Sequence, residues 1–172
     1  GLGADALNAG AVDRVFAVKK RAPDKALLIL VPDRKVVFKL AAEVPPAAKR
    51  LMDRFWPGQV TIVFTAFPGL PPNLTAGTGR IGIRLPGHPV ARALVETFGR
   101  PITGTSANLS GQKGCHRIDQ LDALLIDQLD LVLDAGPLKE GIGSTVVDIT
   151  GAKPIVIREG VVPKRAILVA LY

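Results

Sequence analysis

The chain has 172 residues, enough for one compact domain, and its 48% hydrophobic and 22% charged residues argue against disorder. Twenty-two Lys and Arg against fifteen Asp and Glu give a net charge of +7 and a pI near 9.9, which favours polyanionic partners such as nucleotides or nucleic acid. A single cysteine excludes an internal disulfide, and no apolar run reaches the roughly 18 residues that span a bilayer, so we expect a soluble cytoplasmic protein.

The first predicted element is a helix that closes with a group of cations. Apolar residues at helical spacing follow Asn8, whose side chain is a favourable N-cap. The cations at the other end are Lys19, Lys20, Arg21 and Lys25. They suit the negative end of a helix dipole, so solvent-facing side chains are one interpretation. The other is a phosphate clamp, because Arg offers a planar fork and Lys a point charge to an oxyanion.

Strand and helix patterns alternate in the next part of the chain. Residues 26–31 are a continuous apolar run before a proline and predict a buried strand. Two prolines open a predicted helix over residues 45–55, and residues 60–64 predict a second strand, entered through the turn Trp56-Pro57-Gly58. Residues 68–79 are rich in Pro and Gly, which indicates a loop long enough to form a lid or a binding loop.

An arginine interrupts the predicted apolar strand at residues 81–86. Arg is seldom buried without a partner, so Arg84 either faces an anion, such as a ligand carboxylate, or lies on the solvent face of an edge strand. A helix is predicted over residues 89–98. His88, just before this helix, is favoured as a capping or turn residue, with a catalytic role as the alternative. Neither His88 nor His116 has Asp or Glu neighbours at the spacing of a zinc site, so we expect no metal site.

Residues 101–111, PITGTSANLSG, organise the rest of the chain. A short β-prone run breaks at Gly104 into small hydroxyl and amide side chains, among them Ser106 and Asn108. Small side chains let a ligand approach the backbone, and exposed amide groups can form an anion-binding nest. The alternative is an ordinary turn, since Ser, Thr and Asn also hydrogen-bond their own backbone.

The last part of the chain predicts a surface helix over residues 118–129 and a short strand over residues 131–133. Two paired strands over residues 146–150 and 154–158 follow, and a terminal helix over residues 163–172 ends the chain. Ser144 precedes the paired strands and is a turn residue by its local pattern. Strands and helices alternate irregularly, which predicts the α/β class, with a twisted mixed parallel and antiparallel sheet flanked by helices in one domain over residues 1–172. The chain has no GxxxxGK[ST] loop and no GxGxxG turn, so it would bind ATP without these motifs.

Six blocks resemble, in the same order, the motifs of the YrdC-like family and together cover nearly the whole chain. They are Lys19-x-Arg21, Trp56-Pro57-Gly58-x-Val60-Thr61, Gly82-Ile83-Arg84-Leu85-Pro86, Ser106-Ala107-Asn108-Leu109-Ser110-Gly111, Ser144-Thr145-Val146-Val147-Asp148 and Arg158-Glu159-Gly160. The chain is similar to the short, single-domain form of the family, and the family's PT[DE]TVYG strand would lie before Gly1. It departs from the pattern at Lys25, Leu30 and Gly114, where many or some members have Asn, His and Ser.

The resemblance implies an enzyme of tRNA modification. Family members convert L-threonine, bicarbonate and ATP into threonylcarbamoyl-adenylate and pyrophosphate, which supplies N6-threonylcarbamoyladenosine beside the anticodon. Implied partners are ATP with Mg²⁺, L-threonine, bicarbonate, a downstream threonylcarbamoyl transferase and tRNA or double-stranded RNA, with no membrane. Two alternatives stay open: an RNA-binding module, and a carbamoyl-adenylating domain like that of hydrogenase-maturation carbamoyltransferases.

The resemblance also divides the implied site into two parts. The positions that match ATP contacts are Arg21, Lys25, Arg80, Ser106, Asn108 and Arg158. Arg84 and Ser144 match positions that hold threonine, and Thr61 belongs to the same cleft. Lys19 and Arg21 would be catalytic, because the reaction joins two anions that a pair of cations can neutralise and position without a covalent nucleophile.

Overall fold

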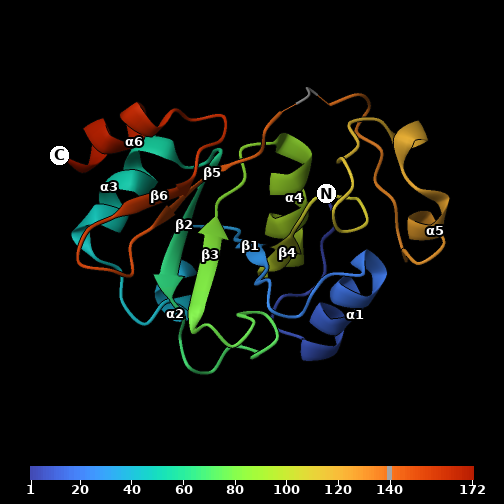
Figure 1. The fold of residues 1–172 in the computed structure, drawn as a ribbon, viewed down its shortest axis with the longest axis horizontal. Helices are drawn as coiled ribbons and strands as arrows, with labels where there is room; N and C mark the ends of the chain where they lie inside the picture. Colours follow the sequence, from blue (N-terminus) through green and yellow to red (C-terminus); the bar gives the residue numbers. More distant parts are fainter. Residues whose placement is uncertain (139–140) are drawn as a thin grey trace.

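Short runs rich in Val, Ile and Leu form one six-stranded sheet in the computed structural model, which describes residues 1–138 and 141–172 (Figure 1). The strands are β1 Leu28–Leu30, β2 Val60–Thr65, β3 Arg80–Arg84, β4 Ile102–Gly104, β5 Thr145–Asp148 and β6 Ile155–Arg158. Their order across the sheet is β4-β1-β3-β2-β5-β6. The pairs β1–β3 and β2–β5 are parallel and the other three are antiparallel, which confirms the predicted mixed α/β class.

The helices begin and end where capping chemistry allows. They are α1 Ala9–Lys19, α2 Val37–Leu40, α3 Pro46–Phe55, α4 Pro89–Phe98, α5 Ala123–Ile126 and α6 Lys164–Leu171, with a 3-10 turn η1 at Ile118–Gln120. The Asn8 side chain accepts a hydrogen bond from the Ala11 amide at 3.1 Å, as predicted for the α1 N-cap. Pro46 and Pro89 occupy first-turn positions, where a missing N–H costs nothing, and Gly99 closes α4 in the left-handed conformation.

Two predicted elements are wrong, and one helix was not predicted. Residues 118–129 contain η1 and the one-turn α5 in place of a continuous helix, because the Asp122 side chain accepts a bond from the Leu124 amide at 2.9 Å and caps a new turn. Residues 131–133 form no strand and lie outside the sheet. The apolar residues before α3 form the short helix α2.

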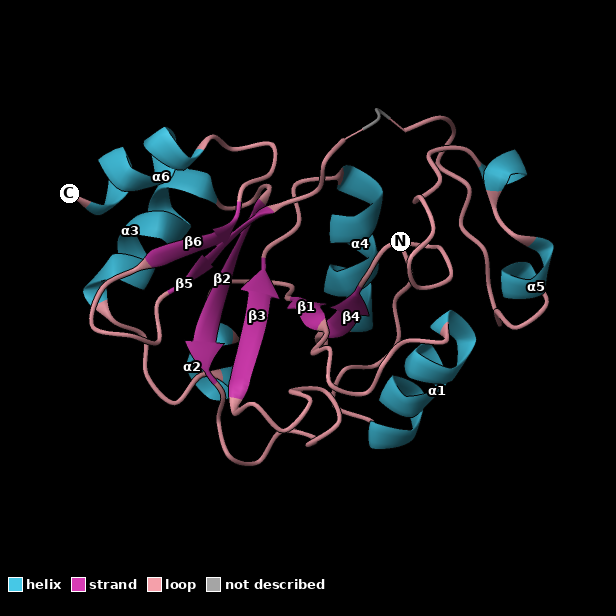
Figure 2. Cartoon of the chain, viewed as in Figure 1, coloured by secondary structure: helices cyan, strands magenta, loops and turns pink. Residues whose placement is uncertain are grey.

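The two faces of the sheet are covered differently. Ile62, Ile83 and Val147 point into the main core, which α3 and α6 complete with residues such as Leu51 and Ile167. On the opposite face, α4 covers only β1 and β4, where Val95 packs against Leu30 and Ile102. Figure 2 shows α3 and α6 beside β5 and β6 at one end, with α4 beside β1 and β4. The opposite face is therefore less covered over β3, β2, β5 and β6.

The first residues of the chain lie along the β4 edge of the sheet. The Leu2 amide donates to the Thr105 carbonyl at 2.8 Å, and the Thr103 amide donates to the Ala4 carbonyl at 2.8 Å. These bonds place Gly1 beside the turn that follows β4. Among the described residues, no helix is long and apolar enough to cross a membrane.

Candidate functional site

One face of the sheet carries the strand residues that the sequence singled out. Gly82 and Arg84 alternate to this face, and a Cβ atom at Gly82 would lie 3.2 Å from the Thr61 side chain, so Gly82 leaves room for that threonine. Val146 is in register with Thr61, and Arg158 is in register with Val146. We term this surface the site face and define it by the residues Thr61, Arg80, Gly82, Arg84, Val146, Asp148 and Arg158.

A fixed pair of hydroxyl groups lies at the start of β5. The Ser144 Oγ and Thr61 Oγ1 atoms are 2.9 Å apart, and the two residues are only 3% and 1% exposed. The Arg158 guanidinium donates to the Ser144 carbonyl at 2.8 Å and to its hydroxyl at 3.1 Å. Side chains of two strands, β2 and β6, thus hold Ser144 in one position, which its local sequence, typical of a turn, did not predict.

Arg84 lies in the same row of the sheet, in register with Thr61. Its Nε atom is buried and makes no hydrogen bond, and no ion pair joins its guanidinium to a carboxylate among the described residues. Burial lowers the pKa of Arg84, and the nearby charge of Arg158 lowers it further. A half-buried cation beside a second cation is stabilised by an anion, so this geometry favours the ligand-facing interpretation of Arg84.

Lys19 at the end of α1 holds the 106–108 turn. Its Nζ atom donates to the Ser106 carbonyl, to the Asn108 carbonyl at 2.6 Å and to the Asn108 side-chain oxygen at 3.2 Å. The residue is 1% exposed, and burial followed by repulsion from Arg21 lowers the Lys19 pKa to about 8. The Ser110 amide also donates to the Lys19 carbonyl at 2.8 Å. Lys19 is therefore a buried residue that links α1 to the 106–108 turn. Neither the solvent-facing nor the simple phosphate-clamp interpretation accounts fully for these contacts.

Arg21 and Lys25 lie just beyond this link. The Arg21 guanidinium donates to the Lys25 and Ala26 carbonyls at 2.9 and 2.8 Å, so its side chain is fixed by main-chain oxygens. Burial lowers the Arg21 pKa, and Asp24 partly offsets that shift. The Lys25 side chain is exposed.

Gly1 lies near both the turn and the site face. Its backbone nitrogen is within electrostatic reach of both Lys19 and Arg84. Ser106, Asn108, Lys19 and Arg84 thus belong to one region of the molecule, although they come from α1, β3 and the turn after β4.

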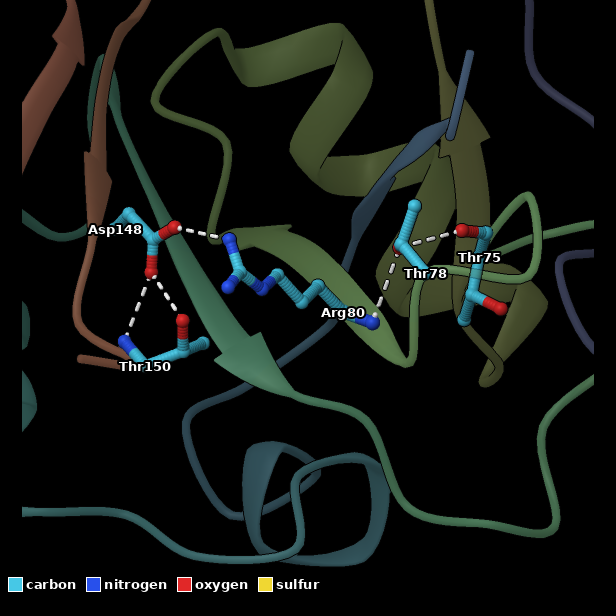
Figure 3. A network of polar contacts seen from close by, with 5 residues as sticks. All are labelled: Thr75, Thr78, Arg80, Asp148 and Thr150. Carbon is cyan, nitrogen blue, oxygen red and sulfur yellow. Dashed lines mark hydrogen bonds and ion pairs between the residues drawn. The ribbon is translucent and has the colours of Figure 1, made fainter. Parts of the chain in front are cut away.

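Arg80 belongs to a separate polar network at the other end of β3 (Figure 3). Its guanidinium donates to the Asp148 carboxylate at 3.0 Å, and its amide donates to the Thr78 hydroxyl at 3.2 Å. The other Asp148 oxygen accepts bonds from the Thr150 amide and hydroxyl at 2.8 and 2.7 Å. Because β2 lies between β3 and β5, the Arg80 side chain crosses β2 to reach Asp148. Among the predicted ATP contacts, Arg80 thus has a guanidinium that is already paired with a carboxylate.

Two positions contribute to this site that residue chemistry alone did not single out. Asp148 was noticed only as the end of a motif, and its role depends on the parallel β2–β5 pairing. Gly160 is buried, and a Cβ atom there would lie 2.5 and 2.6 Å from the Ser144 carbonyl carbon and the Thr145 nitrogen. Its amide donates to the Thr145 hydroxyl at 2.9 Å. A glycine is required for this close approach, and the motif Arg-Glu-Gly was its only signal.

The donor atoms in the described part of the site are mostly nitrogen cations and hydroxyls. Among the described residues, no group of three or more His, Cys, Asp or Glu side chains is placed to hold one. The site region instead presents guanidinium groups, one buried lysine and hydroxyls, which suit anions. The fold and this donor set together define an α/β domain with the chemistry of an anion-binding protein.

Comparison with known proteins identifies the family. Residues 1–160 match the family model of the Sua5/YciO/YrdC domain, whose description is telomere recombination, and the chain belongs to this family. It is 35% identical over 163 residues to threonylcarbamoyl-AMP synthase of Pyrococcus abyssi, covering 95% of this chain and 48% of that protein. It is 39% identical over 163 residues to a putative threonylcarbamoyl-AMP synthase of Methanocaldococcus jannaschii, covering 95% of this chain and 76% of that protein.

A solved structure agrees with this assignment. The fold matches Sua5 of P. abyssi complexed with L-threonine, with a TM-score of 0.92 and 33% identity over 99% of this chain and 50% of that one. The chain thus spans about half the length of this relative. The resemblance to the YrdC-like family that the motifs indicated is confirmed.

Proposed function

We propose that the protein is an L-threonylcarbamoyladenylate synthase, a nucleotidyltransferase that forms threonylcarbamoyl-AMP and pyrophosphate from L-threonine, bicarbonate and ATP. The names of the curated relatives and the L-threonine bound to P. abyssi Sua5 support this proposal. Its product would supply the threonylcarbamoyl group to a transferase that modifies tRNA.

The observation that carries the proposal is the half-buried Arg84, whose buried Nε atom makes no hydrogen bond among the described residues, beside the Thr61–Ser144 hydroxyl pair. A free amino acid offers one carboxylate for a guanidinium, and threonine offers a hydroxyl that a second hydroxyl group can recognise. Arg84 and Ser144 would accordingly hold L-threonine. Arg158, which fixes Ser144, would face the nucleotide with its remaining donors.

The first chemical step would join threonine and bicarbonate. The threonine nitrogen bonds to the bicarbonate carbon, the nitrogen gives up a proton, and water leaves, so the product is an N-carboxylate. Such a carbamate falls apart readily in water, so its use requires that ATP be bound next to it. The residues that hold threonine and ATP therefore act first by proximity.

The second step would transfer the adenylyl group. A carbamate oxygen bonds to the α-phosphorus of ATP as the bond from that phosphorus to the bridging oxygen breaks, and pyrophosphate leaves. Both reactants are anions, so cations that bring them together lower the barrier. Arg21, Lys25, Arg80 and Arg158 would contact ATP together with Ser106 and Asn108. Lys19 and Arg21 would be catalytic, with Lys19 also keeping the 106–108 turn in place.

Magnesium would enter this reaction as part of the ATP substrate. The described residues offer it no cluster of acidic side chains, and we assign it no protein ligand. Bound to the phosphates, Mg²⁺ would neutralise part of their charge.

The proposal is tested by pyrophosphate release from MgATP, with L-threonine and bicarbonate omitted in turn and carbamoyl phosphate offered in their place. Release that requires both threonine and bicarbonate supports the synthase. Release with carbamoyl phosphate alone would identify a carbamoyl-adenylating domain. Salt-sensitive binding of double-stranded RNA without any turnover would identify an RNA-binding module.

A further inference from the structure

A groove on the far side of the sheet from the site face has no role in the proposed reaction. It has a volume of about 660 Å³ and lies between α3 and α6, which pack side by side at the end of the molecule near the C-terminus (Figure 1). Its lining residues are Arg50, Asp53, Arg54, Phe55, Arg165, Ala166, Val169 and Ala170. We term it the α3–α6 groove. Both helices bury their other faces in the core, through residues such as Leu51 and Ile167, so the core and the sheet lie between the groove and Arg84.

The charges of the groove are unbalanced. The described residues provide no ion-pair partner for Arg50, Arg54 or Arg165. The one carboxylate in the lining, that of Asp53, is already paired with the Arg34 guanidinium at 2.7 Å. Arg50 and Arg54 are one helical turn apart on α3, where like charges destabilise a helix slightly. Three guanidinium groups thus face the groove without compensation.

Half of the residues that line the groove are apolar. They are Phe55, Ala166, Val169 and Ala170, and Val169 is 81% exposed. Apolar side chains between unpaired arginines form a surface that is complementary to apolar residues flanked by carboxylates. An amphipathic helix with Asp and Glu beside its apolar stripe has this arrangement.

We propose that the α3–α6 groove docks an acidic amphipathic helix of a partner protein. A second copy of this chain is a poor occupant, because a two-fold contact would set arginines against arginines in a chain of net charge +7. A nucleic-acid backbone would leave the apolar part of the lining without a partner. A membrane surface is too flat to enter a groove.

The probe is a synthetic, fluorescently labelled helical peptide of about 15 residues, with Leu at helical spacing and Glu on both flanks of the Leu stripe. Its binding to the protein is measured by fluorescence anisotropy at low salt, beside a peptide with Lys in place of Glu, one with Ser in place of Leu, and a short RNA duplex. The protein variants are Arg54→Glu and Val169→Asp. Lys49→Glu is the matched control, because Lys49 is an exposed residue of α3 that does not line the groove.

The acidic Leu peptide is expected to bind saturably, and Arg54→Glu and Val169→Asp to weaken it at least about tenfold while Lys49→Glu changes it less than about twofold. Pyrophosphate release is expected to be unchanged in all three variants, so the groove can fail without the proposed function failing. Absence of saturable binding, an equal effect of Lys49→Glu, or equal binding of the Ser peptide overturns the proposal. RNA binding that depends on Arg54 while peptide binding does not would assign the groove to nucleic acid instead.

Discussion

Lys19 and Asn108 are joined twice, since the Lys19 ammonium donates to the Asn108 carbonyl at 2.6 Å and to its side-chain oxygen at 3.2 Å. A third bond runs from the same nitrogen to the Ser106 carbonyl. Three acceptors require all three protons of an ammonium group. The shape of the 106–108 turn is therefore coupled to the charge of one buried lysine.

We predict that ATP affinity falls as the pH rises above 8. The Lys19 pKa is lowered to about 8, so above that pH the amine loses a proton that holds the 106–108 turn and a positive charge that would favour the nearby phosphates. For one linked proton the association constant falls by at most about tenfold per pH unit. Calorimetric titration with ATP from pH 6.5 to 9.5, about 1.5 pH units on either side of that value, measures this slope. Lys20→Gln is the control, because Lys20 is the exposed neighbour and its replacement should leave the pH dependence of ATP affinity unchanged. An ATP affinity that does not change with pH in the parent protein would contradict the prediction.

Folding stability is predicted to change in the opposite direction over the same range. The folded-state pKa of Lys19 lies below its usual value of 10.5, so between the two values the unfolded chain binds more protons than the folded one. The contribution of Lys19 to the free energy of unfolding therefore rises with pH from about 8 to 10.5. Urea unfolding of the parent protein and of Lys19→Met at several pH values measures it. A contribution that falls over this range would show that the buried ammonium is not destabilised.

Arg84→Gln is predicted to raise the KM for L-threonine by about 30- to 150-fold. Charged hydrogen bonds to a carboxylate contribute about 2–3 kcal/mol, and about 1.4 kcal/mol corresponds to a factor of ten. The KM for ATP should change little, since Arg84 is assigned to threonine. Arg92→Gln is a control, because Arg92 forms a surface pair with Glu96 at 2.7 Å, outside the site face. An unchanged threonine KM in Arg84→Gln would remove Arg84 from the threonine site.

Much of the fold could be predicted because its signals are local. The Asn8 cap and the prolines before α3 and α4 mark helix starts through chemistry within one turn. Local capping chemistry also explains why the prediction of a continuous helix over residues 118–129 was wrong. An aspartate in the middle of an apolar pattern can start a new turn. Hydrophobic periodicity does not reveal whether such an aspartate continues a helix or ends it and caps a new turn.

The candidate site could be predicted by residue type but not by contact. The arginine within an apolar strand suggested that Arg84 needs an anion, and its Nε atom makes no hydrogen bond in the part of the chain that the structure describes. The Arg80–Asp148 pair joins residues 68 apart in sequence and depends on strand order, which no local pattern encodes. Lys19 shows the same limit, because burial decides whether a helix-terminal lysine is a solvated charge or a link inside the protein.

Arg80 and Asp148 are predicted to have opposite effects on ATP binding. If Arg80 contacts ATP, it must leave the Asp148 carboxylate, so Asp148→Asn removes a competitor and should tighten ATP binding by about two- to fivefold. Arg80→Met should weaken ATP binding by about five- to thirtyfold. Asparagine keeps an oxygen for Thr150, so the turn after β5 is preserved. Isothermal titration of both variants decides the role, because equal weakening would make the ion pair a structural tie.

Gly160→Ala is predicted to lower the stability of the fold and to displace Ser144. The added Cβ would lie 2.5 Å from the Ser144 carbonyl carbon and 2.6 Å from the Thr145 nitrogen, both backbone atoms that cannot rotate away. Overpacking of this kind costs about 1–3 kcal/mol, which lowers the Tm by about 2–12 °C in a chain of this length. The KM for threonine should rise as well, because Ser144 moves relative to Arg84. Gly151→Ala is the matched control, since its added Cβ meets only the Lys153 carbonyl at 3.9 Å. If both variants melt at the same temperature as the parent, the close approach of Gly160 is not what positions Ser144.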